Sequence, residues 1–546
     1  MSEDPQALQV YDTTLRDGAQ QEGLSLSVAD KLAIARHLDA LGVGYIEGGW
    51  PGANPRDTEF FARARTELSL RHATLAAFGS TRRPDTRAGH DPQVRALLDA
   101  DTPVVTLVAK AHPRHVDLAL RTSLAENLDM VVDTVTLLVG AGRRVFLDAE
   151  HFFDGYLADP GYACEVLARA ADAGAEVLAL CDTNGGMLPD RVGEVVADVA
   201  DRLGGVRLGI HCHNDTGCAV ANSLAALDAG ARHVQGTLNG YGERTGNADL
   251  VTVVADLELK RGHPVLPPGT LREATRIAHA VSEITNVVPY SRQPYVGASA
   301  FTHKAGLHAS AIRVDPALYQ HVDPGEVGND MRLLVSDMAG RASVELKSRE
   351  LGYDLAGDRA LAGRITDEVK AREARGYTYE AADASFELLL IGELTGQPPR
   401  FFDVESWRVL TESQPGGEAR SEAIVHLRFG EERVLAAGEG NGPVNALDAA
   451  LRRAVGQVHP HIYDLELIDY RVRIVEPTHG TGAVTRVLVE TSDGTRSWQT
   501  VGVGANVVEA SWEALVDGIT YGLLDTANLR PPAADAASGP AVSPPR

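Results

Sequence analysis

Cysteine is scarce in this chain of 546 residues. It has only Cys164, Cys181, Cys212 and Cys218, and no two of them form a CxxC pair. So few cysteines exclude a disulfide scaffold at this length and predict a reducing compartment. The N-terminal segment MSEDPQALQV lacks the apolar region of a signal peptide, and no run of about 18 apolar residues occurs. We therefore expect a cytoplasmic protein without a membrane partner.

Basic residues are outnumbered by acidic ones. The 51 Lys and Arg against 75 Asp and Glu leave a formal net charge of −24, which argues against nonspecific binding to nucleic acids or anionic membranes. Aromatic residues make up only 5% of the chain, while 44% hydrophobic and 23% charged residues are typical of globular proteins. At roughly 150 residues per domain, the length predicts three to four domains.

The first 260 residues alternate between short β-rich segments and Ala/Leu-rich segments with helical spacing. The predicted strands are Val10–Thr14, Gly44–Glu47, Ala73–Phe78, Val104–Val108, Arg144–Asp148, Glu176–Cys181, Arg207–His211 and Arg232–Thr237. The predicted helices include Ser27–Leu41, Arg114–Val139, Pro160–Ala173, Pro189–Leu203 and Thr216–Ala229. Eight such repeats in the α/β class favour a (β/α)₈ TIM barrel over the alternative, an open doubly wound sheet.

The remainder of the chain has a different organisation. The alternation ends near PVLPP at 264–268, helical segments follow, and GQPPR at 396–400 is typical of a linker. Beyond it, GEGNGPVNALDAAL from Gly438 and GVGANVVEASWEAL from Gly502 share six of fourteen residues, which predicts a duplicated βββα module. The expected domains are a barrel at 1–265, linking subdomains at 266–400, the duplicated module at 401–528 and a disordered tail at 529–546.

A His-x-His pair ends the seventh predicted strand. Because residues i and i+2 of a strand project to the same side, His211 and His213 can present two imidazoles to one point, while Cys212 points away. Asp17 and Asn247 follow other strands and would add oxygen ligands at the same rim. Mixed nitrogen and oxygen ligands favour a catalytic divalent ion, Mn²⁺, Mg²⁺ or Zn²⁺, over a closed structural zinc. The alternative is a pair of histidines satisfied by ordinary hydrogen bonds.

Three segments carry a family resemblance. LRDGAQ followed after ten residues by Lys31, LGIHCHNDTGCAVA at 208–221 and GYGERTGNA at 240–248 resemble segments of the α-isopropylmalate/homocitrate synthase family. The duplicated module resembles the regulatory domain of that family. IEGGWPGANPRD and LDAEHFFDGY are most similar to its citramalate synthase subgroup, which condenses pyruvate with acetyl-CoA.

The resemblance implies roles for individual residues. Those that resemble the family's metal ligands are Asp17, His211, His213 and Asn247. Arg16 and Thr183 resemble the groups that hold the 2-oxoacid, and Glu150 the acidic residue near the acetyl methyl group. His308 and Tyr319 resemble a histidine and its tyrosine partner that the subdomain after the barrel contributes. Ser310 stands where relatives often have Asp, which puts any acid–base role of that Asp in doubt here.

The resemblance also implies an activity and a regulator. The expected enzyme is an acyltransferase that makes (R)-citramalate for isoleucine biosynthesis, is inhibited by isoleucine and forms a homodimer. One alternative keeps the family but uses another 2-oxoacid, giving 2-isopropylmalate or homocitrate. A second is a lyase of the wider superfamily, and a third is a catalytically inactive amino-acid sensor. The duplicated module argues against the lyase, and the intact Arg16, Asp17 and His211 argue against the sensor.

Overall fold

The computed structural model describes residues 7–312, 314–336, 340–355, 358–413, 418–475 and 482–524. Contacts divide the chain into two compact units, Met1–Phe301 with Val322–Asp330, and Thr302–His321 with Met331–Arg546. The domain boundaries predicted at 265, 400 and 528 stay predictions. The predicted tail at 529–546 lies outside the described residues.

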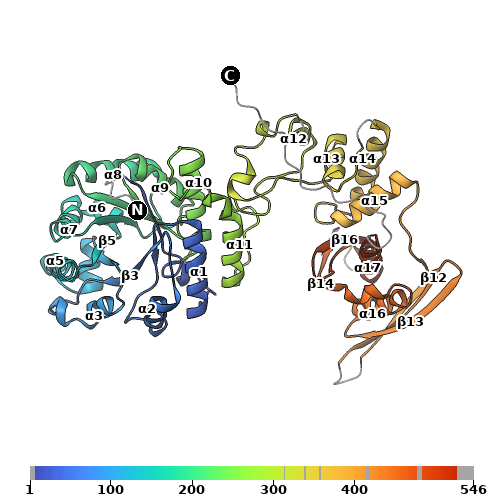
Figure 1. The fold of residues 1–546 in the computed structure, drawn as a ribbon, viewed down its shortest axis with the longest axis horizontal. Helices are drawn as coiled ribbons and strands as arrows, with labels where there is room; N and C mark the ends of the chain where they lie inside the picture. The colour runs from blue at the N-terminus through green and yellow to red at the C-terminus, as the bar shows by residue number, and fades with distance from the viewer. Residues whose placement is uncertain are drawn as a thin grey trace. The chain divides into compact units, whose positions relative to one another are not determined.

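The first unit contains a closed barrel of eight parallel strands, as predicted (Figure 1). The strands are β1 (Gln9–Asp12), β2 (Tyr45–Glu47), β3 (Thr74–Ser80), β4 (Val104–Lys110), β5 (Arg144–Glu150), β6 (Val177–Asp182), β7 (Arg207–Cys212) and β8 (His233–Gly236). They pair in chain order, and the barrel closes where Val10 of β1 lies opposite Val234 of β8. The carboxyl ends of all eight strands therefore meet at one rim.

Helices surround the strands in Figure 1. They are α1 (Val28–Leu41), α2 (Pro55–Glu67), α3 (Pro92–Asp99), α5 (Leu124–Gly140), α6 (Phe152–Ala158), α7 (Pro160–Asp172), α8 (Pro189–Leu203), α9 (Ala219–Asp228), α10 (Leu250–Leu259) and α11 (Ala274–Thr285). A capping box begins α1, since the Ser27 side chain accepts from the Asp30 N–H and the Asp30 carboxylate accepts from the Ser27 N–H.

One predicted helix is interrupted. Instead of a single helix over Arg114–Val139, a short turn α4 (Pro113–His115) and a π-helical turn (Val116–Leu120) precede α5. Arg121 adopts a left-handed conformation with φ of 56°, which ends the turn. The Ser123 side chain then accepts a hydrogen bond from the Glu126 N–H and starts α5 afresh. The sequence predicted one helix because its Ala/Leu pattern continues through both Arg121 and Ser123.

The barrel interior is layered with large and polar side chains. Tyr11, Tyr45 and Phe146 are fully buried and contact one another at the bottom of the barrel, with ring centroids 5.2–6.1 Å apart. Nearer the rim, buried polar residues replace the apolar ones that parallel strands usually carry; they are Glu47, Thr106, Asp148, His211 and Gln235. This polar layer supports the rim from below.

The second unit begins with a small helical part. Its elements are β9 (Thr302–His303), α12 (Gly306–Ile312), β10 (Arg332–Leu333), α13 (Arg341–Glu350), α14 (Arg359–Ala374) and α15 (Asp383–Thr395). β9 and β10 pair in parallel, and α13–α15 enclose a core around Val344, Ile365 and Phe386.

The predicted duplication is present in the rest of this unit. The first half is β11 (Asp403–Glu412), β12 (Arg420–Phe429), β13 (Glu432–Gly440) and α16 (Pro443–Gly456); the second is β14 (Glu466–Ile474), β15 (Thr485–Ser492), β16 (Ser497–Gly504) and α17 (Val507–Leu523). Each sheet is antiparallel, and each carries a bulge near the start of its first strand. The shared Gly438 and Gly502 lie where a side-chain methyl would overlap the backbone of the following helix.

Two further expectations concern the described residues. Cys164, Cys181, Cys212 and Cys218 are all free, in agreement with the absence of a disulfide scaffold. Within these ranges, every helix is too short or too polar to cross a membrane.

Candidate functional site

Asp17, His211 and His213 form a buried cluster at the barrel rim. The Nε2 atoms of His211 and His213 lie 3.2 and 3.5 Å from Asp17 Oδ2, and each residue is at most 5% exposed. Their ligand atoms lie within 4.8 Å of one another. His211 is the penultimate residue of β7, and Asp17 follows β1. Strand β8 pairs with both β1 and β7, so these two strands lie close together. The fold therefore brings together three of the four predicted metal ligands.

The fourth predicted ligand, Asn247, adjoins this cluster. Its backbone forms an isolated bridge with His213, and its Nδ2 donates to the Tyr241 carbonyl at 3.0 Å. This orients Asn247 Oδ1 away from Tyr241, and within the described residues that oxygen is buried without a hydrogen-bond partner. An orphaned buried oxygen beside one carboxylate and two imidazoles fits a divalent cation.

Arg16 is held firmly beside the cluster. Its Nε donates to Glu47 Oε1 at 2.6 Å, its Nη1 lies 3.4 Å from Asp17 Oδ1, and the Phe78 ring centroid lies 3.8 Å from its Cζ. Glu47 is fully buried at the end of β2 and also accepts from the hydroxyls of Tyr11 and Thr13. Three donors fix the carboxylate, which in turn fixes the guanidinium.

The charges of Asp17, Arg16 and Glu47 stabilise one another. Burial opposes ionisation of Asp17, but Arg16 and the two imidazoles hold the pKa of its carboxyl well below the usual range. Burial also opposes the charge on Arg16, yet Glu47 and Asp17 raise the pKa of the guanidinium above its ordinary value. A permanent cation therefore lies next to a permanent carboxylate in a region shielded from water.

Glu150 and Thr183 occupy the same rim on neighbouring strands. Glu150 ends β5 and forms an ion pair with Lys110 at the end of β4. Thr183 follows β6; its hydroxyl accepts from the His151 N–H at 2.9 Å and its carbonyl from Arg244 at 2.8 Å. Arg244 is itself paired with Asp215 through two contacts of 2.8 and 2.9 Å. Both predicted residues thus lie at the rim with partners that hold them.

The predicted His308 and Tyr319 belong to the second unit. His308 lies on α12, and its ring stacks on that of Tyr319 with centroids 4.1 Å apart and planes 30° apart. Tyr319 follows the short turn Pro316–Leu318 and is 39% exposed. The two residues that the resemblance paired are therefore in contact with each other.

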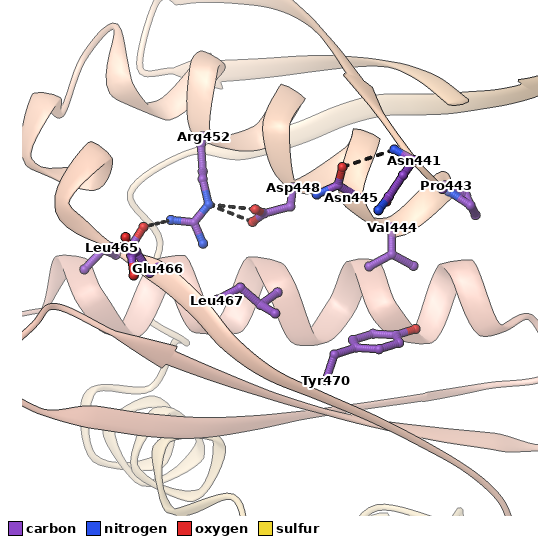
Figure 2. Close-up of a pocket in the computed structure, with 11 residues that line it drawn as sticks. Asn441, Pro443, Val444, Asn445, Asp448, Arg452, Leu465, Glu466, Leu467 and Tyr470 are labelled. Carbon is purple, nitrogen blue, oxygen red and sulfur yellow. Dashed lines mark hydrogen bonds and ion pairs between the residues drawn. The ribbon is translucent and has the colours of Figure 1, made fainter. Parts of the chain in front are cut away.

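A cavity lies in the duplicated module. It has a volume of about 570 Å³ between the start of α16 and strand β14 (Figure 2). Val444, Leu467 and Tyr470 give it an apolar wall. On its polar side, Arg452 Nε donates to both oxygens of Asp448 at 2.8–2.9 Å.

Sequence reasoning left several site residues without a role. The sequence assigns no role to Glu47, Lys110, Asp148 or Gln235, and it includes Arg244 only within the family segment GYGERTGNA. A signal for three of them exists in the sequence, because Glu47, Asp148 and Gln235 interrupt strands that a buried parallel sheet should fill with apolar side chains. Lys110 has no such signal, since its partner Glu150 comes from the next strand.

Three family models match successive parts of the chain. Residues 7–281 match the HMGL-like model, residues 295–376 the homocitrate synthase post-HMGL domain-like model, and residues 380–523 the LeuA allosteric (dimerisation) domain. The chain is 64% identical over 524 residues to "(R)-citramalate synthase" of Streptomyces coelicolor, covering 96% of this chain and 98% of that one. The proteins of the same name from Aquifex aeolicus (47%; 94% and 97% covered) and Synechocystis sp. (48%; 95% and 96%) are also similar. The chain therefore belongs to the HMGL-like family, in its (R)-citramalate synthase branch.

Proposed function

We propose that the chain is an acyltransferase that condenses acetyl-CoA with pyruvate to give (R)-citramalate in isoleucine biosynthesis. In this reaction the acetyl methyl group loses a proton and bonds to the ketone carbon of pyruvate, whose oxygen gains a proton; water then cleaves the thioester and releases CoA. The identity of 64% to an (R)-citramalate synthase over 96% of the chain is the observation that carries the proposal. The buried cluster at the barrel rim supplies the chemistry it needs.

Four residues would hold a divalent ion, Mn²⁺, Mg²⁺ or Zn²⁺: Asp17, His211, His213 and Asn247. When bound, such an ion supplies a Lewis acid for the oxygens of the 2-oxoacid. Arg16 adds a fixed cation toward the ketone oxygen, where negative charge develops as the C–C bond forms. Since Glu47 and Phe78 already fix the guanidinium, little reorganisation is required during the reaction. Thr183 holds the pyruvate carboxylate at the same rim.

Two groups are candidates for the base that removes the methyl proton. Glu150 lies on the rim, where its ion pair with Lys110 orients the carboxylate. His308 stacks on Tyr319, which restricts rotation of the imidazole. A positioned base contributes typically about 10²–10⁴-fold to the rate. Exchange of the acetyl methyl protons in D₂O, measured for variants of each residue, identifies which of them acts.

A panel of 2-oxoacids tests the activity. Purified enzyme with Mn²⁺ and acetyl-CoA should release free thiol with pyruvate, and kcat/KM for pyruvate should exceed that for 2-oxobutyrate, 2-oxoisovalerate and 2-oxoglutarate. A preference for 2-oxoisovalerate would favour the 2-isopropylmalate alternative, and a preference for 2-oxoglutarate would favour homocitrate. If no thiol appears with any 2-oxoacid, the proposal is wrong.

We propose further that isoleucine inhibits the enzyme by binding in the cavity of Figure 2. Helix α16 begins at Pro443 with no side-chain cap, so its free N–H groups can receive the amino-acid carboxylate. Val444, Leu467 and Tyr470 offer apolar contacts to a branched side chain, and Asp448 offers a carboxylate to the ammonium group. The match of residues 380–523 to an allosteric (dimerisation) domain supports a regulatory role.

The same domain supports a homodimer. Val472 and Ile474 lie two residues apart on β14, beyond its bulge, and are 47% and 55% exposed, which gives one face of this strand an apolar surface. We propose that a second copy of the chain covers it. The molar mass from light scattering should be twice that of the 58.1 kDa chain, and Val472→Asp should shift it toward the monomer.

A further inference from the structure

A line of three buried side chains runs behind one imidazole of the rim cluster. His211 Nδ1 lies 3.0 Å from Gln235 Oε1, and Gln235 Nε2 donates to Asp148 Oδ1 at 2.7 Å. His211, Gln235 and Asp148 are 5%, 0% and 3% exposed. His211 and Gln235 are direct register partners on β7 and β8, so the sheet itself sets their spacing, while Asp148 reaches them from β5. We propose that Gln235 and Asp148 are positioning residues that fix the orientation and the tautomer of His211 for metal binding.

Asp148, the last of the three side chains, sets the direction of each hydrogen bond between them. An ionised carboxylate can only accept, so Asp148 requires the amide nitrogen of Gln235 to point toward it. The amide oxygen then faces His211, where it too can only accept. When a metal is bound, the proton of the neutral imidazole must therefore be on Nδ1, which leaves Nε2, the atom 3.2 Å from Asp17 Oδ2, free for the metal. This is the tautomer that a metal ligand bound through Nε2 requires.

The second imidazole has no equivalent support. His213 Nδ1 is buried, and within the described ranges it has no hydrogen-bond partner. Its ring contacts that of His211 with centroids 5.2 Å apart. The two histidines of the His-x-His pair are therefore unequal, and the line from Asp148 determines the geometry of only one.

The line is also unusual for its place in the fold. Polar side chains inside a barrel cost free energy unless each is hydrogen-bonded, and the interior of parallel strands is ordinarily apolar. Here the amide of Gln235 satisfies both of its neighbours at once. A side chain with only a structural role at this position would not need a hydrogen-bond acceptor directed at His211 Nδ1, the ring nitrogen that faces away from Asp17.

The inference rests on the metal site of the proposed function, so metal binding is measured without substrates. Free Mn²⁺ is followed by electron paramagnetic resonance during titration of the full-length protein. Gln235→Met keeps the side-chain length but removes the acceptor, and its Mn²⁺ affinity should fall roughly 10- to 100-fold. Gln235→Glu keeps an acceptor for Nδ1, and one proton shared with Asp148 preserves their contact, so its Mn²⁺ affinity should stay much closer to wild type than that of Gln235→Met. Asp148→Asn should also bind more weakly, because an amide at this position can donate to Gln235 and lets the Gln235 amide reverse.

Thr106→Val is the matched control, since Thr106 is a fully buried polar residue of the same interior that bonds Tyr11 instead of His211. Its Mn²⁺ affinity should not change. The absorption spectrum of the Co²⁺-loaded protein should change in Gln235→Met and not in Gln235→Glu, which a loss of packing alone would not produce. Circular dichroism of the metal-free variants checks that they are folded.

Equal Mn²⁺ affinity of wild type and Gln235→Met would overturn the inference. Equal loss in Gln235→Met and Gln235→Glu would do so as well, because packing and not the acceptor would then matter. If the wild-type protein itself binds no Mn²⁺, Mg²⁺ or Zn²⁺, the metal site of the proposed function is wrong instead.

Discussion

Arg16 Nε donates to Glu47 Oε1 at 2.6 Å, and this bond joins the rim of the barrel to its polar interior. Glu47 receives two further hydrogen bonds, from Tyr11 at 2.6 Å and Thr13 at 2.8 Å. The position of the guanidinium is therefore decided one layer below the rim, by a carboxylate that contacts no predicted metal ligand directly.

Glu47→Gln should lower kcat/KM for pyruvate without abolishing metal binding. A hydrogen bond to a charged group is worth about 1.5–3 kcal/mol, which corresponds to roughly 10- to 150-fold in rate. The measurement is thiol release at several pyruvate concentrations. Glu176→Gln is the matched control, because Glu176 pairs with Arg144 near the amino ends of the strands. An unchanged kcat/KM in Glu47→Gln would show that Arg16 does not depend on this carboxylate.

Removal of the metal should abolish turnover. After treatment with a chelator, activity should return on addition of Mn²⁺, Mg²⁺ or Zn²⁺, and the order of recovery identifies the preferred ion. Asp17→Asn should weaken metal binding by more than the roughly 10- to 100-fold that loss of an outer-shell partner costs, because it changes a ligand itself. Asp190→Asn, on the exposed start of α8, is the control. Full activity in Asp17→Asn would contradict the metal assignment.

His308→Gln should lower kcat while metal affinity stays at the wild-type value. If His308 is the base, the loss is about 10²–10⁴-fold, and exchange of the acetyl methyl protons falls in parallel. Tyr319→Phe keeps the stacked ring and removes only the hydroxyl, so it separates the stacking from hydrogen bonding. His263→Gln, at an exposed position, controls for loss of a histidine. Unchanged proton exchange in His308→Gln would assign the base to Glu150.

Inhibition by isoleucine should depend on the cavity at α16. Tyr470→Ala removes part of its apolar wall, and the isoleucine concentration for half inhibition should rise about tenfold, the equivalent of one lost contact of roughly 1.4 kcal/mol. Tyr463→Ala, which removes a 59% exposed tyrosine outside the cavity, should leave inhibition unchanged. A chain ended near Gly396 should not respond to isoleucine. Persistent inhibition of that shortened chain would place the inhibitor site elsewhere.

The barrel should lose stability in mild acid through His233. Burial, with smaller effects of Arg207 and Arg144, lowers the pKa of this fully buried imidazole to about 3, whereas an unfolded chain titrates near 6.5. Between these values the unfolded chain binds a proton that the folded barrel does not, so stability falls as the pH falls, by about 1.4 kcal/mol per unit well below pH 6.5. The melting temperature of His233→Gln should therefore decline less than that of wild type between pH 7.5 and 5. Parallel curves for the two proteins would refute this.

Much of the architecture follows from local pattern. The eight strands lie within a few residues of their predicted positions, because a β-rich segment followed by a helix is a short-range signal. The helix predicted at Arg114–Val139 shows the limit of that reasoning, since the left-handed Arg121 and the cap at Ser123 interrupt a continuous apolar pattern. Element type depends on periodicity, whereas element ends depend on single residues.

The sequence by itself determined the candidate metal ligands, because the two-residue spacing of His211, near the end of β7, and His213, just beyond it, directs both imidazoles to Asp17. It also determined the duplication, through glycines that two helices need in order to approach their sheets. Only the tertiary structure decided the partners: Glu47 for Arg16, Lys110 for Glu150, and Gln235 with Asp148 for His211. These pairs come from strands far apart in the chain, and closure of the barrel makes them neighbours in a way that spacing along the sequence does not encode.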